Sequence, residues 1–457
     1  MIVPLSLVAL VALLALALLA SPFPYLAPGA VLGLLGVVLL YRRPAWGLLA
    51  LVAVLPFEGL FRDSSFSAAK FLGLSLMLVL ALQLALRQIP ASHLRSNLWP
   101  LLLGFSALYL LSLWASDDRQ ASLGDLRNLL VGPVVFVITL VLGRGLNLGL
   151  FCRLTVLGIA LTCAMALLSS HFQDEGRAAG LLDDPNLMAM IVAFAVPLAL
   201  LLAIHSPSAG QRLLWLGCIG LLLAGMTATQ SRSGLLVLLL SLGLGVWHYR
   251  SHLPGIRPRH LGFAMLALAI AVPLAAYTVP ASYFARMQSL AALGGNVSTQ
   301  ADESLGRRAS YVLVGGQLIL EHPLLGAGPG TFPQHYANSG YAKLFIASHR
   351  KPGDLLREAH NTYLGLLAET GIPAALLFIA MIALGLWNFL RARALCLRRG
   401  AHEQADLLTH LGISLLVLAL FLLFLSVPNL KYLWIMLALS AVLRQQVEQA
   451  TRQEARP

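Results

Sequence analysis

A series of long apolar segments, separated by short connections, runs through nearly the whole chain and constrains its fold more than any other feature. An apolar segment of about 20 residues can cross a bilayer as an α-helix, and within lipid every backbone polar group must find its partner inside the protein. Hydrophobic residues make up 58% of the 457 positions and charged residues only 11%, whereas a soluble domain carries about 25% charged residues. The sequence therefore predicts a polytopic membrane protein.

The apolar segments predict an all-α fold, a polytopic transmembrane helix bundle of 12–14 helices, in a single integral-membrane domain over residues 1–457. The range reflects two short segments, at about 28–41 and 45–57, which can form a re-entrant pair or a tilted hairpin. Residues 2–20 lack a basic n-region, which favours a retained first helix over a signal peptide. The segments fall at about 2–20, 28–41, 45–57, 71–86, 98–115, 128–143, 154–170, 186–204, 213–230, 234–249, 261–279, 361–390, 408–427 and 430–444.

The distribution of Lys and Arg among the connections predicts the orientation, because connections rich in these residues stay in the cytoplasm. Basic connections such as the one that holds Arg42 and Arg43 alternate with connections that hold few basic residues and most of the acids. This alternation places both termini in the cytoplasm and residues 280–360 outside, as one large and partly helical loop. Membrane topology also accounts for the net charge of +12, so nucleic acid is not a predicted partner.

The outer loop and the helix entrance after it, residues 304–373, form the longest polar interruption and are predicted to be the functional part. Arg307 and Arg308 open an amphipathic stretch, and the segment GAGPG at 326–330 is expected to reverse the chain between two amphipathic pieces. This segment lacks the Lys-Ser/Thr of a phosphate-binding P-loop. Charged groups near lipid are costly unless they bind or react with something, and cations imply an anionic ligand.

Arginines on the outer face are the candidate ligands of such an anion. A guanidinium stays charged and presents a planar fork of donors that suits a phosphate or pyrophosphate. The alternative is that each arginine anchors a helix end at the lipid headgroups. For Arg232 an anion is favoured, because its TQSRSG hairpin is too short to reach far into water. The candidates are Arg177, Arg232, Arg286, Arg307 and Arg308.

His360 and Asn361 begin the helix that follows the outer loop. Histidine has an unperturbed pKa of about 6.5, so it can accept a proton from a hydroxyl near neutral pH. The alternative is a helix cap or a headgroup contact. Glu369 lies about two turns into the same helix and is expected to pair with a buried arginine rather than to act as a general base.

Neither a metal nor another cofactor is expected. The pairs Asp117-Asp118 and Asp183-Asp184 could hold a divalent cation, but the second pair also fits a plain helix N-cap. The four cysteines show no CxxC spacing, so the sequence gives no indication of a disulfide or zinc framework.

Several segments, in chain order over about residues 55–440, resemble those of the O-antigen ligase family of membrane glycosyltransferases. They are PFEGLFRDSSFSAAKFLGL, GRAAGLLDDPN, SRSG, GRRASYVLVGGQLILEHPLLGAGPGTF, REAHNTYLGLLAETGIP and KYLWIMLALS. The resemblance implies a transferase at the periplasmic face of a bacterial inner membrane. Such an enzyme passes a glycan from undecaprenyl pyrophosphate to an acceptor hydroxyl without a metal.

The resemblance also implies residue roles. By position, Arg232, Arg286 and Arg308, with Arg177 as an addition, would bind the donor pyrophosphate, and His360 would be the catalytic residue that assists the acceptor. The supporting residues would be Arg307, Asn361 and Glu369, and the adjacent pair leaves open whether Arg307 or Arg308 contacts the phosphate. Direct attack at the anomeric carbon would invert its configuration.

Two functions from this family and one from another class fit the sequence. A ligase would use lipid A–core as its acceptor, whereas a polymerase of O-antigen or exopolysaccharide would use the growing glycan, with the same donor chemistry. The other class is a transporter or flippase for a lipid-linked or anionic solute. A transporter should place charge along a path through the membrane and often has paired broken helices, whereas the charge here lies mainly at one face.

Overall fold

The structure is a computed structural model that describes residues 13, 16, 20, 27–61, 68–174, 176–182, 184–250, 303–344 and 355–454. These residues are almost wholly helical, with one two-stranded sheet, so the predicted all-α polytopic fold is confirmed. The predicted apolar segment 261–279 and most of 2–20 lie outside the described residues. The division into one domain with an outer loop at 280–360 stays a prediction.

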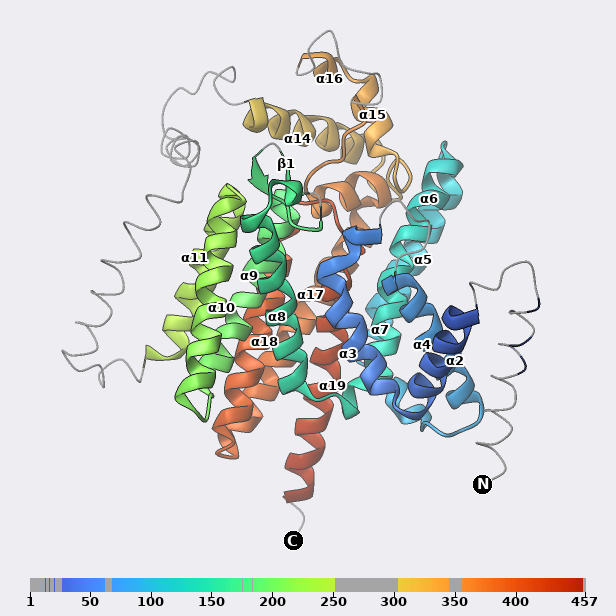
Figure 1. The fold of residues 1–457 in the computed structure, drawn as a ribbon. Helices are drawn as coiled ribbons and strands as arrows, with labels where there is room; N and C mark the ends of the chain where they lie inside the picture. Colours follow the sequence, from blue (N-terminus) through green and yellow to red (C-terminus); the bar gives the residue numbers. More distant parts are fainter. Residues whose placement is uncertain are drawn as a thin grey trace, which may run out of the picture.

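The predicted apolar segments within the described chain all lie largely on helices, which pack side by side in a bundle (Figure 1). The first half holds α2 (Ala27–Arg42), α3 (Pro44–Val54), η2 (Leu55–Phe61), α4 (Ala68–Ala85), η3 (Ala91–Leu94), α5 (Trp99–Ala115), α6 (Arg119–Leu129), α7 (Val131–Leu142) and η4 (Gly143–Gly145). Then follow α8 (Leu148–Leu168), η5 (Ser170–Phe172), β1 (Gln173–Asp174), β2 (Arg177–Ala178), α9 (Pro185–Ile204), α10 (Ala209–Ala228) and α11 (Arg232–His248). The last part holds α14 (Glu303–Glu321), α15 (Phe332–Asn338), α16 (Gly340–Leu344), α17 (Thr362–Arg398), α18 (His402–Phe421) and α19 (Lys431–Glu454).

Among the described residues, six helices are long and apolar enough to cross a bilayer, or seven if a bent pair forms one span. That pair joins the second half of α2, Leu35–Arg42, to Pro44–Gly59 of α3 and η2 with a bend of 116°, which is the geometry of a broken span or a re-entrant pair. The sequence-based range of 12–14 is larger because it also includes shorter apolar helices, such as α4, α5 and α11, and segments outside the described chain.

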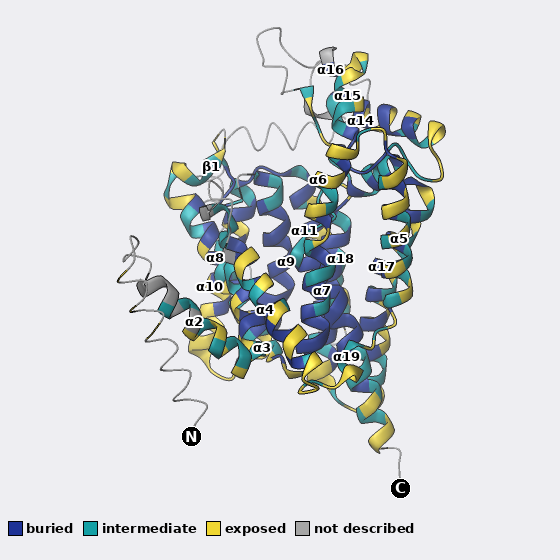
Figure 2. Ribbon diagram, turned by 90° about the vertical axis from the view of Figure 1, so that its right-hand side faces the viewer, coloured by how far each residue is buried: buried dark blue, intermediate teal, exposed yellow. Residues whose placement is uncertain are grey.

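The helix α9 forms the centre of the bundle. It is apolar on all sides, and 78% of its most apolar stretch is buried inside the protein, compared with 28% for its neighbour α10. The buried residues concentrate in the interior around α9, α18 and α7 (Figure 2), so other helices rather than lipid surround most of α9. The remaining apolar side chains face outward, as expected where lipid is the solvent.

Three helices of the predicted outer loop, α14, α15 and α16, cap one end of the bundle, and the C-terminal end of α19 projects from the other (Figure 1). The amphipathic stretch predicted after Arg307 and Arg308 is the helix α14. Its buried residues Tyr311 and Val314 pack in a small core with Phe332 of α15.

The long helix α17 is broken near its N-terminal end. Gly371 has φ 82° and ψ 167°, so the helical hydrogen bonds stop there and backbone carbonyls are left open. Residues 326–330, which we call the glycine turn, supply the missing donors: Ala327 N donates to Ala368 O and Gly328 N to Glu369 O, both at 2.9 Å. The predicted chain reversal is therefore confirmed, and it also completes the broken helix.

The glycine turn has no room for larger side chains. Gly326 has φ +69°, and a Cβ there would lie 2.2 Å from the carbonyl carbon of Glu369. Gly328 has φ +112°, and its Cβ would lie 2.1 Å from the hydroxyl oxygen of Ser116 on the neighbouring helix connection. The hydroxyl of Ser122 in α6 also donates to Pro329 O at 2.8 Å. The turn thus joins α17 to the start of α6.

We predict that Gly326→Ala destabilises the protein by about 2 kcal/mol or more, because the methyl group meets backbone at a left-handed position. Thermal unfolding of the detergent-solubilised protein measures this. Gly316→Ala in α14 is the matched control, since a Cβ there meets nothing within 4 Å. An unchanged melting temperature for Gly326→Ala would show that the turn does not hold α17.

Candidate functional site

Two predicted elements of the site, the strand with Arg177 and the hairpin with Arg232, lie against each other. Arg177 Nε donates to the carbonyl of Thr229, the residue that ends α10, at 2.9 Å. The hairpin is as tight as predicted, with only residues 229–231 between α10 and α11. Gln230 in the hairpin has φ +51°, a left-handed conformation that is uncommon for a residue other than glycine.

The entrance of α9 joins this group. The hydroxyl of Ser231 donates to Asn186 Oδ1 at 2.9 Å, which ties the hairpin to the first turn of α9. Asp184 caps that helix by accepting from the backbone N–H groups of Asn186 at 2.6 Å and Leu187 at 3.1 Å. The N-cap reading of the acidic pair is therefore confirmed for Asp184, while Asp183 lies outside the described residues.

Asn361 is the N-cap of α17, and its side chain accepts from the backbone N–H groups of Tyr363 at 3.0 Å and Leu364 at 3.1 Å. His360 stands just before the helix, half-buried, with φ +47°. Its ring lies against that of Tyr311 in α14, with the centroids 5.6 Å apart. A residue held in a left-handed conformation by its surroundings often marks a functional site.

Charged groups from α14, from the loop before α17 and from the N-cap of α9 act on His360. Burial is the first cause that lowers the pKa of His360 below its ordinary value, and the positive charges of Arg308, Arg357 and Arg307 lower it further. The negative charge of Asp184 raises the pKa of His360. The fold therefore brings the His360 entrance together with the arginines of α14 and with the capped end of α9.

Three of the predicted arginines need separate comment. Arg286 lies outside the described residues. Arg307 and Arg308 are both half-buried on α14, and which of them contacts a phosphate stays a prediction. Arg357 was not among the residues predicted from the sequence. Its positive charge lowers the pKa of His360, as do those of Arg307 and Arg308. Its signal was its place three positions before the histidine in REAHN.

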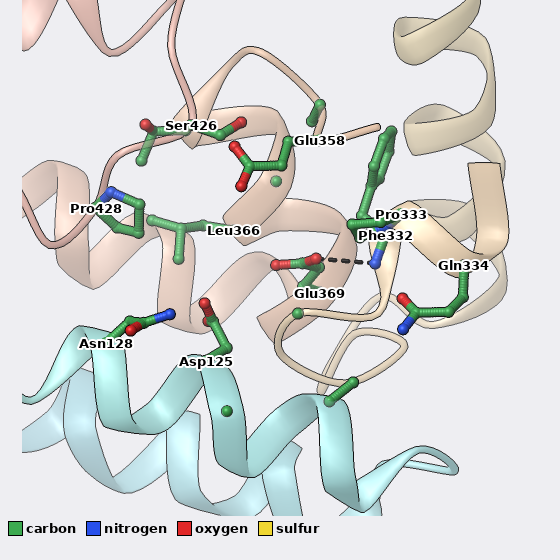
Figure 3. Close-up of a pocket in the computed structure, with 16 residues that line it drawn as sticks. Asp125, Asn128, Phe332, Pro333, Gln334, Glu358, Leu366, Glu369, Ser426 and Pro428 are labelled. Atoms are coloured by element: carbon green, nitrogen blue, oxygen red, sulfur yellow. Dashed lines mark hydrogen bonds between the residues drawn. The ribbon is translucent and has the colours of Figure 1, made fainter. Parts of the chain in front are cut away.

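The structure corrects the expectation for Glu369. Its Oε1 accepts from the backbone N–H of Phe332 at 2.9 Å (Figure 3), and its carboxylate also accepts from the N–H of Gly330. Thr331, the N-cap residue of α15, gives no side-chain cap, so Glu369 caps that helix from a distance. Glu369 therefore pairs with open backbone donors of the glycine turn and α15 rather than with an arginine.

A cavity of about 370 Å³ lies beside Glu369 and reaches the loop before His360. Three carboxylates line it, from Asp125 in α6, Glu358 and Glu369, and Figure 3 shows them around one space. Asp125 and Glu358 were missed from the sequence because nothing local indicates that they meet. Among the described residues there is no group of three or more His, Cys, Asp or Glu side chains that could hold a metal ion.

Residues 217–379 match a protein-family model described as "O-Antigen ligase". The matched segment runs from α10 to α17 and includes Arg232, Arg307, Arg308, His360 and Glu369. The resemblance read from the sequence is therefore confirmed. A search of curated proteins returned no match.

We predict that Glu369→Gln destabilises the protein by about 1–3 kcal/mol, because an amide keeps only one acceptor oxygen for the two N–H groups that the carboxylate binds. Thermal unfolding in detergent, followed by intrinsic fluorescence, measures the loss. The control is Glu321→Gln at the exposed end of α14, where the carboxylate accepts from Gln317 on the same helix. Equal stability of the two variants would contradict the capping role.

Proposed function

We propose that this multi-pass membrane protein, whose residues 217–379 match the O-antigen ligase family, transfers a glycan from undecaprenyl pyrophosphate to an acceptor hydroxyl. The reaction takes place at the periplasmic face of the bacterial inner membrane, and lipid A–core is the acceptor. The family consists of glycan-transferring enzymes of the O-antigen ligase and polymerase type. The observation that carries the proposal is the meeting of His360 with three arginines at the capped end of the bundle.

The donor's leaving group needs cations. When the bond between the anomeric carbon and the pyrophosphate breaks, negative charge develops on the phosphate oxygen, and fixed guanidinium groups stabilise it. Arg308 and Arg232, with Arg286 and Arg177, form this clamp, and Arg307 supports it. Because α14, which carries Arg307 and Arg308, caps one end of the bundle (Figure 1), the polyprenyl tail can remain in the bilayer while its head group reaches the arginines.

The acceptor needs a base. A lowered pKa keeps the imidazole of His360 neutral at physiological pH, so it can take the proton of the attacking hydroxyl. The acceptor oxygen then forms the new bond to the anomeric carbon, and the pyrophosphate leaves with the electrons of the old one. A single direct attack inverts the configuration at that carbon. Asn361, as the N-cap of α17, holds the histidine at the helix entrance.

A deletion strain tests the proposed function. Loss of all long-chain glycan on lipopolysaccharide, with lipid-linked polymer accumulating, is the result expected for a ligase. Single-repeat capping, or loss of exopolysaccharide with normal lipopolysaccharide, would instead identify a polymerase. Purified protein that moved lipid-linked glycan across liposomes without changing its glycosidic bond would identify a flippase.

We predict that Arg232→Lys and Arg308→Lys each lower the transfer rate at least tenfold, because lysine keeps the charge but loses the two-pronged fork. His360→Ala should stop transfer while donor binding remains within about twofold of wild type, because the base acts only on the acceptor. Reconstituted transfer and donor-binding assays on folded variants measure both. Transfer by His360→Ala at the wild-type rate would disprove the role of the histidine.

The pH dependence of transfer follows from His360. Since its pKa is lowered, the acidic limb of the rate profile should lie below the ordinary value of about 6.5. Arg357→Gln removes a positive charge that lowers this pKa, so the limb should move to higher pH. Arg127→Gln, a charge loss on the exposed face of α6, is the control and should leave the limb in place. A profile unchanged by Arg357→Gln would contradict the assignment of the base.

A further inference from the structure

The cavity beside Glu369 has the size and composition of a ligand site. Its volume of about 370 Å³ falls within the range of about 300–1,000 Å³ that is usual for small-molecule pockets. Four separate parts of the chain build it: α6, the loop before α17 together with α17 itself, the turn that leads into α15, and the segment after α18. Figure 3 shows Asp125 and Asn128 of α6 facing Glu358 and Glu369 across the same space.

The polar groups of the cavity retain capacity for hydrogen bonds. Asp125 Oδ2 accepts from the hydroxyl of Tyr109 at 2.6 Å, and Glu369 Oε1 accepts from Phe332 N. A carboxylate offers about four acceptor positions, so each keeps some for a ligand. The hydroxyl of Ser426, which also lines the cavity, is shielded from solvent and has no hydrogen-bond partner within the described chain. An unpartnered buried hydroxyl costs free energy unless a ligand or water satisfies it.

Glu358 is the most exposed of the three acids, and within the described part of the chain its carboxylate has no hydrogen-bond or ion-pair partner. Partial desolvation raises the pKa of this carboxyl, and the negative charges of Asp125 and Asp184 raise it further. Carboxylates that face one another without a cation repel, and they are relieved by ligand groups that donate hydrogen bonds.

Groups of opposite charge lie near His360. The positive charges of Arg307, Arg308 and Arg357 act on the histidine, whereas Glu358, only two positions before it, belongs to the acidic cavity. A phosphate would be attracted to the first group and repelled by the second. A neutral sugar suits the cavity, since its hydroxyls donate to carboxylates and its C–H groups can lie on Leu366, Pro333 and Pro428.

From this arrangement we infer that the cavity lined by Asp125, Glu358 and Glu369 binds the sugar residue that receives the glycan. It selects an uncharged or amino sugar over one that carries phosphate or carboxylate. The inference rests on the proposed transferase function and adds the chemical class of the acceptor sugar. It also assigns Asp125 and Glu358 to acceptor binding, next to the base that takes the acceptor's proton.

The transfer test uses full-length protein in proteoliposomes, with lipid-linked glycan as donor and a series of acceptor concentrations. Glu358→Gln and Asp125→Asn should raise the acceptor KM at least tenfold and leave the donor KM within about twofold. Glu321→Gln, the same charge change on the outer face but away from the cavity, should change neither. The inference is wrong if the two KM values rise together, if neither rises, or if Glu321→Gln has the same effect.

A binding test separates this inference from the proposed function. The probes are the released neutral repeat unit of the host glycan, the same saccharide with a phosphate ester, and Ca²⁺ alone, each titrated calorimetrically into the detergent-solubilised protein. The neutral saccharide should bind the wild type and lose at least tenfold in affinity in Glu358→Gln, while the phosphate ester should bind more weakly than its parent. Such a result supports the cavity even if no transfer is found.

Two outcomes of the binding test would overturn the inference. Tighter binding of the phosphate ester than of the neutral saccharide would show that the acids do not select against anions. Binding of Ca²⁺ that is lost in Glu358→Gln, together with saccharide binding that is unchanged in that variant, would identify the cavity as a cation site.

Discussion

The contact between the glycine turn and the broken helix α17 is the interaction on which the His360 end of the bundle depends. A helix interrupted at Gly371 leaves carbonyls without partners, and such groups are expensive to bury away from water. The amides of Ala327 and Gly328 satisfy them, while the carboxylate of Glu369 satisfies the amides of Gly330 and Phe332. Because donors and acceptors are exchanged in both directions, the turn, α15 and the outer part of α17 hold one another in place, and with them the loop that carries His360.

The site that results combines two groups of opposite charge. Arginines of α14 and Arg357 act on His360, and the acids Asp125, Glu358 and Glu369 line the cavity that reaches the loop before it. A transfer from a pyrophosphate carrier to a hydroxyl needs both groups, since the leaving group is anionic while the attacking group is a neutral hydrogen-bond donor. In the proposed mechanism the histidine stands between them, where the proton must be removed. Asp184, the cap of α9, moderates the positive charge and links the histidine to the hairpin of Arg232 through Asn186 and Ser231.

Local features of the sequence predicted much of this arrangement. Apolar length predicted the helices, the residues Asp184 and Asn361 predicted helix starts, and the glycine-rich segment predicted a reversal. The partner of Glu369 and the meeting of Asp125 with Glu358 could not be predicted, because they depend on where Gly371 breaks α17 and on the docking of segments far apart in the chain. The sequence suggested an arginine as the partner of Glu369, because it does not reveal that backbone N–H groups of the turn lie within reach of the carboxylate. The position of Arg286 lies outside the described residues.

The stereochemistry of the new bond tests the account most directly. The proposed geometry has one base and one anion clamp on opposite sides of the reacting carbon, with no covalent intermediate on the protein, so one direct attack occurs. Nuclear magnetic resonance of the purified product of reconstituted transfer, compared with the donor, gives the anomeric configuration before and after the reaction. The account predicts inversion of that configuration with every turnover. Retention would contradict it, because two successive displacements would then require a nucleophile that the proposed mechanism does not include.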